Sequence, residues 1–384
     1  MNAVQLAAVL AAAIVLASIL SVESGIAVAL LELGLGVVVG NVFGVGGSQE
    51  WLTFIAAFAS IVLTFLAGTE VDPDDFRERF AQTMAIGIVS FVGPFVVASL
   101  VAYGPLGWTL KASLIAGTAL STTSLAVIYA VLVETGLNAT RVGKLLMGAC
   151  FVTDMGTALA LSAIFITPNA WFPVFIVVSV AVIVALPKLA PWFFRRYGDR
   201  VIEPEIKLVF VCLFALMVLA DASKGQAVLP AFVLGLVMSR HYREHRQEQQ
   251  RLRVVAFAFL TPFFFLKGGL NVSLGAVFAN LALLAVLFAA KMVPKLALVF
   301  PLARRAEPRH AQFITLLMST GLTFGTISSL YGLNAGIIDR TQFSLLVTVV
   351  VLSAIVPTAI AQWRYSPLGD LDRHTEPLPA EEYV

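Results

Sequence analysis

The sequence predicts an all-α polytopic membrane protein of about thirteen transmembrane helices, and its composition is the first indication. Hydrophobic residues make up 59% of the 384 residues and charged residues only 12%, whereas a soluble domain carries roughly a quarter charged residues. The mean hydropathy is +0.92. A soluble globule of this size cannot bury so much apolar surface, and the same excess excludes disordered, fibrous and disulfide-rich secreted proteins.

Apolar segments of membrane-spanning length are the second indication. A helix needs about 20 apolar residues to cross the hydrocarbon core. Neither Lys nor Arg precedes the first segment, and it has no clear cleavage site, so we expect a retained helix rather than a signal peptide. In chain order the thirteen segments span roughly residues 4–21, 25–44, 51–69, 83–103, 109–132, 144–166, 171–191, 206–222, 226–240, 254–271, 275–300, 311–331 and 341–362.

The distribution of positive charge predicts the orientation of these segments, because cytoplasmic loops are enriched in Lys and Arg. Of the 25 Lys and Arg residues, 19 fall on one side of the predicted membrane and three on the other, and the remaining three lie inside segments. We therefore expect a multi-pass protein of the cell membrane, surrounded by membrane lipid, with the N-terminus outside and the C-terminus in the cytoplasm.

An internal repeat predicts the domain organisation. Residues 65–68 read F-L-A-G and residues 265–268 read F-L-K-G; two segments later, S-T occurs at 121–122 and again at 319–320. The offset near 200 residues and the odd number of segments between copies predict two repeats of opposite topology, as in many secondary transporters. The alternative is that these short patterns recur by chance in an apolar chain.

The predicted boundaries follow from that repeat. We expect one transmembrane domain over residues 1–365 and a short cytoplasmic tail over 366–384. Within the domain, the first repeat covers about residues 1–167, a linker helix about 168–195 and the second repeat about 205–363.

Two segments contain hydroxyl residues and Gly at their centres, where a membrane helix is normally apolar. They are Gly117–Ser124 and Ser319–Thr326. Hydroxyl side chains offer the backbone alternative hydrogen bonds and Gly weakens a helix. Their matching positions in the two repeats predict two discontinuous helices that cross near the midplane. The alternative is that small residues serve only tight helix packing.

Asp154 is the one acidic residue at the centre of a segment. A carboxylate at this depth is costly unless it is protonated, paired or bound to an ion. It can hold a proton or a small cation, but not both, which is the chemistry of a proton-coupled cation carrier. Thr153 is adjacent and Cys150 lies one helical turn away, so both can line the site. The alternative is a buried structural acid.

Lys291 is the basic residue most deeply placed among the segments. We expect it either to balance the charge of Asp154 or to neutralise the negative end of a half-helix, with snorkelling to the membrane surface as the alternative. For Lys295 and Lys267, snorkelling is the favoured interpretation. Glu70 closes its segment on the predicted cytoplasmic side and can face a funnel into the protein. The sequence assigns no role to Glu32.

Other function classes lack their motifs. The chain has no G-x-S-x-G, phosphate-binding loop, H-E-x-x-H or paired cysteines at metal spacing, so we expect neither an enzyme nor a cofactor. Nothing in the sequence is typical of nucleic-acid binding. The four His residues fall in predicted cytoplasmic segments and are interpreted as surface residues.

At four places the chain resembles the monovalent cation:proton antiporter superfamily, specifically its second branch, the sodium/hydrogen exchanger-type membrane domain. The stretch Phe65–Asp72 is similar to its F-L-x-G-x-E-x-D pattern, and Gly117–Ser124 to its broken helix. Thr153-Asp154 falls on its ion-binding pair, and Lys291, thirteen residues before Arg304, falls on its membrane-buried lysine.

This resemblance implies a six-helix core and a dimerisation domain, usually in a homodimer. It also implies pH homeostasis through exchange of Na⁺, Li⁺ or K⁺ for H⁺ by an elevator-like movement. Carried over by position, Asp154 is the essential carboxylate, Ser121, Thr122 and Thr123 lie at the helix crossing, and Lys291 is the core lysine. Members with Asp before the essential carboxylate are commonly electrogenic; Thr153 departs from that pattern.

The resulting prediction is a secondary active antiporter in which Asp154 binds Na⁺, or Li⁺ or K⁺, in competition with H⁺. Two alternatives stay open at this point. One is a Na⁺-coupled organic-anion carrier of related architecture, and the other is an ion channel or a cation sensor.

Overall fold

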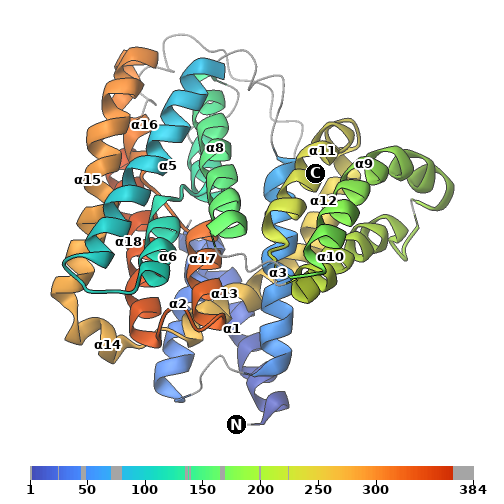
Figure 1. The fold of residues 1–384 in the computed structure, drawn as a ribbon, viewed down its shortest axis with the longest axis horizontal. Helices are drawn as coiled ribbons and strands as arrows, with labels where there is room; N and C mark the ends of the chain where they lie inside the picture. Colours follow the sequence, from blue (N-terminus) through green and yellow to red (C-terminus); the bar gives the residue numbers. More distant parts are fainter. Residues whose placement is uncertain are drawn as a thin grey trace.

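The fold is a bundle of helices, seen in the computed structural model of Figure 1. The structure describes residues 2–24, 26–44, 49–70, 80–134, 137, 140–164, 169–198, 200–223 and 225–365, and every regular element within these ranges is helical. The expected tail, residues 366–384, and Val71–Asp72 of the first motif lie outside the described residues.

The helices of the first half are α1 (Ala3–Ser24), α2 (Val28–Val42), α3 (Glu50–Thr69), α5 (Phe80–Tyr103), α6 (Leu110–Ser121), α7 (Leu125–Glu134) and α8 (Arg141–Ile164). Those of the second half are α9 (Phe172–Tyr197), α10 (Pro204–Ser223), α11 (Val228–Glu244), α12 (Arg246–Val255), η1 (Ala256–Leu260), α13 (Thr261–Leu270), α14 (Leu274–Ala279), α15 (Leu281–Ala306), η2 (Pro308–His310), α16 (Ala311–Met318), α17 (Thr323–Asn334) and α18 (Arg340–Tyr365).

Each of the thirteen predicted segments coincides with helix, and the all-helical membrane fold is confirmed. Among the described residues, ten helical stretches are long and apolar enough to cross a membrane, while α2 and α6 are apolar but shorter. The number of crossings, the repeat boundaries and the orientation stay predictions.

Four segments differ from the continuous outlines predicted for them. The segments at 109–132 and 311–331 are each interrupted, between α6 and α7 and between α16 and α17, as their hydroxyl and Gly residues predict. The segment at 254–271 begins earlier than predicted, because the polar helix α12 continues through the π-helical turn η1 into α13. The segment at 275–300 was expected as one helix, but Asn280 separates α14 from α15.

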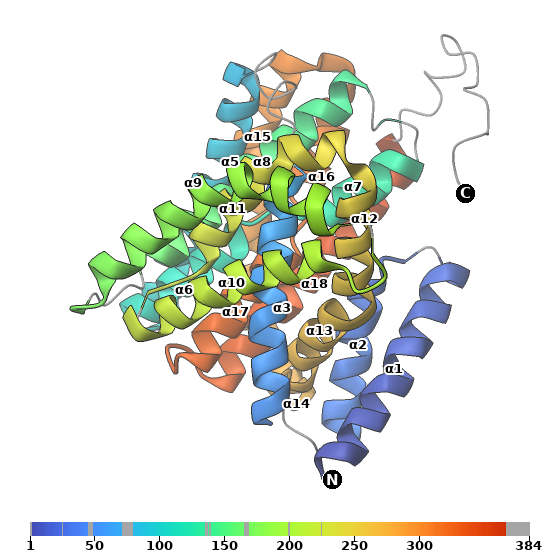
Figure 2. The same cartoon turned by 90° about the vertical axis from the view of Figure 1, so that its right-hand side faces the viewer.

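The helices form two groups. In Figure 1, α5, α8, α15 and α16 lie on the left and α9–α12 on the right, with α17, α13 and α2 between them. The first, named the crossing bundle, contains α5–α8 and α14–α18, and it is joined by the packing of α5 against α6, α8 and α15. The second, named the panel, contains α1–α3 and α9–α13, and it is joined by α3 against α11 and α13. Helix α1 lies at the edge of the panel beside α2 (Figure 2).

Glycines allow the panel helices to approach closely. Gly36 on α2 faces the backbone of Leu266 on α13, and Gly269 on α13 faces the backbone of Leu33. Any side chain at either glycine would clash with main-chain atoms of the other helix, which cannot move aside as a flexible side chain can. This close packing fixes α13 against α2 within the panel. The helix α12 and the turn η1 are held with it, because they continue directly into α13.

Candidate functional site

The crossing of the two interrupted helices is the centre of the site. Helix α6 ends at Ser121, and Thr122 then adopts an extended conformation with φ −64° and ψ 156°. Helix α16 ends at Met318. The four residues from Ser319 to Leu322 separate it from α17. At both interruptions a hydroxyl group donates a hydrogen bond to a carbonyl of its own helix. The Thr122 hydroxyl donates to the Ala119 carbonyl at 3.1 Å, and the Thr320 hydroxyl donates to the Leu317 carbonyl at 2.7 Å. These bonds stabilise both interruptions.

The two interruptions touch each other. The Thr123 hydroxyl donates to the Met318 carbonyl at 3.1 Å, and the Ser124 amide donates to the Thr320 hydroxyl at 3.4 Å. All four residues are buried. The carboxyl ends of α6 and α16 therefore meet inside the protein, where their carbonyl groups carry the negative ends of two helix dipoles.

Two lysines of α15 neutralise these carbonyl groups. The Lys291 ammonium donates to the Leu120 and Thr122 carbonyls, both at 3.1 Å. The Lys295 ammonium donates to the Thr122 carbonyl at 2.9 Å, the Thr123 hydroxyl at 3.0 Å and the Met318 carbonyl at 2.7 Å. Of the roles left open for Lys291, the structure supports neutralisation of a half-helix end.

The expectation that Lys295 and Lys267 snorkel is wrong. Lys295 is fully buried and Lys267 is 1% exposed. Hydropathy reports only how deep these lysines lie in their segments; it does not reveal that the crossing presents three acceptors to Lys295. The Lys267 ammonium has no hydrogen-bond partner among the described residues.

Gly321 leaves room for the Lys291 ammonium. A Cβ atom at this position would lie 2.5 Å from the Lys291 Nζ atom and 3.1 Å from the Thr122 Oγ1 atom. We expect Gly321→Ala to push Lys291 off the α6 carbonyls and to lower the free energy of unfolding by about 1–3 kcal/mol. Thermal denaturation of the purified protein measures this loss. Gly34→Ala is the control, because no atom lies within 4 Å of its added Cβ; an equal shift in both variants would contradict the expectation.

Asp154 lies on α8 next to the crossing. Its side chain is buried, and the Oδ1 atom has no hydrogen-bond partner among the described residues. The adjacent Thr153 differs in this respect, because its hydroxyl donates to the Cys150 carbonyl of the same helix at 2.7 Å. Asp154 therefore offers a free oxygen, whereas the Thr153 hydroxyl is used within α8.

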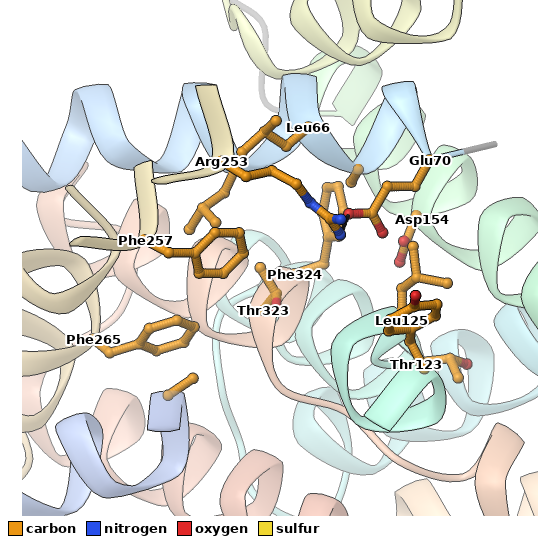
Figure 3. A pocket seen from close by; sticks show the side chains of 14 residues that line it. Leu66, Glu70, Thr123, Leu125, Asp154, Arg253, Phe257, Phe265, Thr323 and Phe324 are labelled. Atoms are coloured by element: carbon orange, nitrogen blue, oxygen red, sulfur yellow. Dashed lines mark hydrogen bonds and ion pairs between the residues drawn. The ribbon is translucent and has the colours of Figure 1, made fainter. Parts of the chain in front are cut away.

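A cavity of about 210 Å³ joins Asp154 to the end of α3. Asp154 and Thr123 line it from the crossing bundle, and Glu70 and Arg253 line it from the panel (Figure 3). The structure thus brings together three of the predicted site residues. The others, Ser121, Thr122, Cys150, Thr153 and Lys291, are buried behind the lining.

Arg253 is a charged lining residue that was not predicted as a site residue. It donates to the Glu70 carboxylate from the last turn of α12. One turn earlier, Gln249 donates to the Thr69 hydroxyl at 3.0 Å. The sequence contains a signal for the placement of Arg253 on a helix that continues into the membrane. Gln249, Arg253 and Phe257 have helical spacing, and this spacing continues without a break into the next apolar segment.

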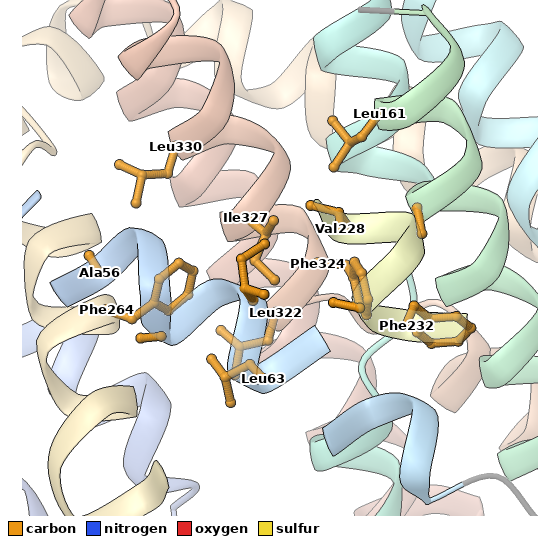
Figure 4. Packing of buried hydrophobic residues seen from close by; sticks show 14 of the residues in the cluster. Ala56, Leu63, Leu161, Val228, Phe232, Phe264, Leu322, Phe324, Ile327 and Leu330 are labelled. Atoms are coloured by element: carbon orange, nitrogen blue, oxygen red, sulfur yellow. The ribbon is translucent and has the colours of Figure 1, made fainter. Parts of the chain in front are cut away.

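Apolar side chains close the cavity away from Glu70. Phe324 and Leu63 line it and also belong to the large buried cluster. The same cluster continues along α17 with Ile327 and Leu330. On α3 it continues toward the N-terminal end of the helix with Ala56 (Figure 4). In Figure 3 Asp154 lies next to Glu70 and Arg253, and it is the most buried of these three charged residues.

The comparison with protein families decides the identity of this architecture. The model of the family described as sodium/hydrogen exchanger, transmembrane, matches residues 6–363. This chain belongs to the sodium/hydrogen exchanger family. The predicted membership of the cation:proton antiporter superfamily is confirmed, and the chain is a transmembrane antiporter of cations and protons.

Individual relatives agree with this membership. The chain is 25% identical over 327 residues to the probable Na(+)/H(+) antiporter 3 of Methanocaldococcus jannaschii, covering 81% of this chain and 82% of that protein. It is 25% identical over 338 residues to the Na(+)/H(+) antiporter NhaS4 of Synechocystis, covering 82% of each. The solved structure of the sodium proton antiporter MjNhaP1 from Methanocaldococcus jannaschii has the same fold, with a TM-score of 0.68, 12% identity and coverage of 94% of this chain and 97% of that chain.

Proposed function

We propose that this member of the family exchanges Na⁺, with Li⁺ or K⁺ as the alternatives, for H⁺, and that Asp154 binds the cation and the proton in alternation. One observation carries the proposal: the Asp154 carboxyl is 2% exposed, has an Oδ1 atom without a partner among the described residues, and lines the cavity. A buried carboxylate in this state is costly unless it holds a proton or an ion. Exclusive occupancy by one or the other makes the exchange obligatory.

Oxygen atoms beside Asp154 suit an alkali cation, which loses part of its hydration shell to carbonyl and carboxylate oxygens when bound. Thr123 and Thr323 are the hydroxyl residues of the crossing that line the cavity in the described part of the chain. Ser121, Thr122, Thr153 and Cys150 would hold the geometry from behind. In this proposal the monovalent cation is the transported substrate, and Asp154 is its main ligand.

Alternating access follows from the place of the cavity between the two helix groups. Asp154 and Thr123 belong to the crossing bundle, whereas Glu70 and Arg253 belong to the panel. We propose that the crossing bundle carries the bound ion past the panel in an elevator-like movement, which would seal the Glu70 side and separate the apolar contacts around Phe324. The panel would also hold two copies together as a homodimer in the membrane lipid.

The stoichiometry proposed is one cation for one proton. Thr153 leaves Asp154 as the one carboxylate of the ion-binding pair, and the Lys291 ammonium is held by two carbonyl groups rather than by an acid. A Lys that stays charged throughout the cycle adds no proton to the exchange. The cycle would then move no net charge.

A flux assay in proteoliposomes tests the proposal. The wild-type protein is titrated with Na⁺, Li⁺ and K⁺ at two membrane potentials while internal pH is recorded. We expect saturable proton flux with Na⁺ that does not change with potential. Proton flux that requires an organic anion would favour the carrier alternative, currents far above carrier turnover would favour a channel, and cation binding without flux would favour a sensor.

A further inference from the structure

The cavity already contains a positive charge of the protein's own. Its lining includes three charged side chains, the carboxylates of Asp154 and Glu70 and the guanidinium of Arg253. Arg253 donates a hydrogen bond to the Glu70 Oε1 atom, and in Figure 3 its side chain extends to Glu70 above Asp154. The charge of this set is therefore −1, from two carboxylates and one guanidinium.

The position of Arg253 is fixed by its helix. Gln249 and Arg253 are one turn apart on α12 and bond to consecutive residues of α3, Thr69 and Glu70. On the first turn of α12, Glu248 accepts a hydrogen bond from the His241 side chain of α11 at 2.9 Å. Arg253 therefore reaches the cavity from a segment held at both ends, and it is not a freely rotating surface arginine.

A π-helical turn begins three residues after Arg253. The turn η1 covers Ala256–Leu260 and includes Phe257, which lines the cavity beside Arg253. π-helical turns inside α-helices occur frequently at functional sites. Here the turn joins the polar α12 to the apolar α13, so that a charged and an aromatic side chain face the same cavity.

We propose that Arg253 is a positioning residue for transport, a tethered cation that occupies Glu70 and thereby sets the affinity for the cation arriving from this side. The inference rests on the proposed function, because it concerns the approach to Asp154. While Arg253 holds Glu70, the arriving cation meets one available carboxylate and one fixed positive charge, which lowers its affinity. Without Arg253, Glu70 would become a second acidic ligand on the path.

Charge substitution makes the proposal testable, because it predicts opposite effects for the two partners of one ion pair. Arg253→Gln changes the charge of the set from −1 to −2, and Glu70→Gln changes it from −1 to 0. We expect the apparent KM for Na⁺ to fall about tenfold in the first variant and to rise about tenfold in the second. The double variant restores −1 and should lie within about threefold of wild type.

A purely structural ion pair gives a different pattern. Losing either partner would then impair the protein in the same direction, and kcat would fall with little change in KM. Arg253→Lys keeps the positive charge and should keep the wild-type KM. Arg251→Gln is the matched control, because Arg251 is two residues away, faces Glu203 at 3.7 Å and does not line the cavity.

The measurement is Na⁺-dependent proton flux of the full-length protein in proteoliposomes, over a Na⁺ titration, with each variant checked for a monodisperse elution profile. Opposite KM shifts with recovery in the double variant support the inference, as does a low KM in Arg253→Gln alone should Glu70→Gln fail to fold. KM shifts of the same sign, or a KM for Arg253→Gln equal to that of Arg251→Gln, would overturn it. Failure of the proposed function is separate, since it appears as absent exchange in the wild type or undiminished exchange in Asp154→Asn.

Discussion

Asp154→Asn is expected to reduce cation-dependent proton flux to the level of protein-free vesicles. The asparagine amide has almost the same shape as the carboxylic acid, but it can neither release a proton nor carry the negative charge that binds a cation. Because the Oδ1 atom of Asp154 has no partner among the described residues, the substitution breaks no hydrogen bond there and the protein should still fold. Flux in proteoliposomes, with thermal denaturation as the check on folding, measures both effects.

Asp221→Asn is the matched control for this prediction. Asp221 is an exposed residue of α10 and does not line the cavity, so the same chemical change should leave flux unaltered. If Asp154→Asn exchanges cations for protons at the wild-type rate, Asp154 is a structural acid and the proposed mechanism is wrong. If both variants lose flux together with thermal stability, the loss reflects folding, and the expectation that Asp154→Asn still folds is wrong.

The sequence predicted the features that depend on depth and local composition. Asp154 stands out because a lone acid at the centre of an apolar segment is costly. The interruptions after Ser121 and Met318 follow from hydroxyl groups that bond to their own helix, a local effect. Membership of the family follows in the same way from motifs within single segments.

Features that depend on which helices meet could not be predicted in this way. Lys295 looked able to reach the membrane surface, since nothing in its own segment shows that the Thr122 and Met318 carbonyls lie within reach. Arg253 looked like one of many cytoplasmic positive charges, and only the packing of α12 along α3 brings it to Glu70. Both are long side chains whose partners lie far away in the sequence, so periodicity and hydropathy carry no information on them.

The crossing has a consequence for the role of positive charge in this protein. Two lysines one turn apart on α15 share the Thr122 carbonyl, so the carboxyl end of α6 is neutralised twice and that of α16 once. The partial charge at a helix end is about half an elementary charge, so two ammonium groups exceed what the two ends provide.

Lys295→Met is expected to destabilise the protein more than any other substitution at the crossing. Methionine fills a similar volume but removes the three hydrogen bonds of the ammonium, to the Thr122 carbonyl at 2.9 Å, the Thr123 hydroxyl at 3.0 Å and the Met318 carbonyl at 2.7 Å. The bond from the Thr123 hydroxyl to the Met318 carbonyl remains. A hydrogen bond contributes about 0.5–1.5 kcal/mol net, so the loss of three should lower the free energy of unfolding by about 2–5 kcal/mol. The midpoint of thermal denaturation in detergent, measured beside wild type at one scan rate, reports the loss.

Comparison with Lys291→Met separates the hydrogen bonds from the general effect of losing a buried charge. Lys291 makes two hydrogen bonds rather than three, to the Leu120 and Thr122 carbonyls. Its loss of stability should be about two thirds of that of Lys295→Met. Lys188→Met, at an exposed position of α9, should shift the midpoint little. Equal shifts for Lys291→Met and Lys295→Met would mean that charge alone matters at the crossing, because the two variants remove the same charge and differ in the number of hydrogen bonds they lose.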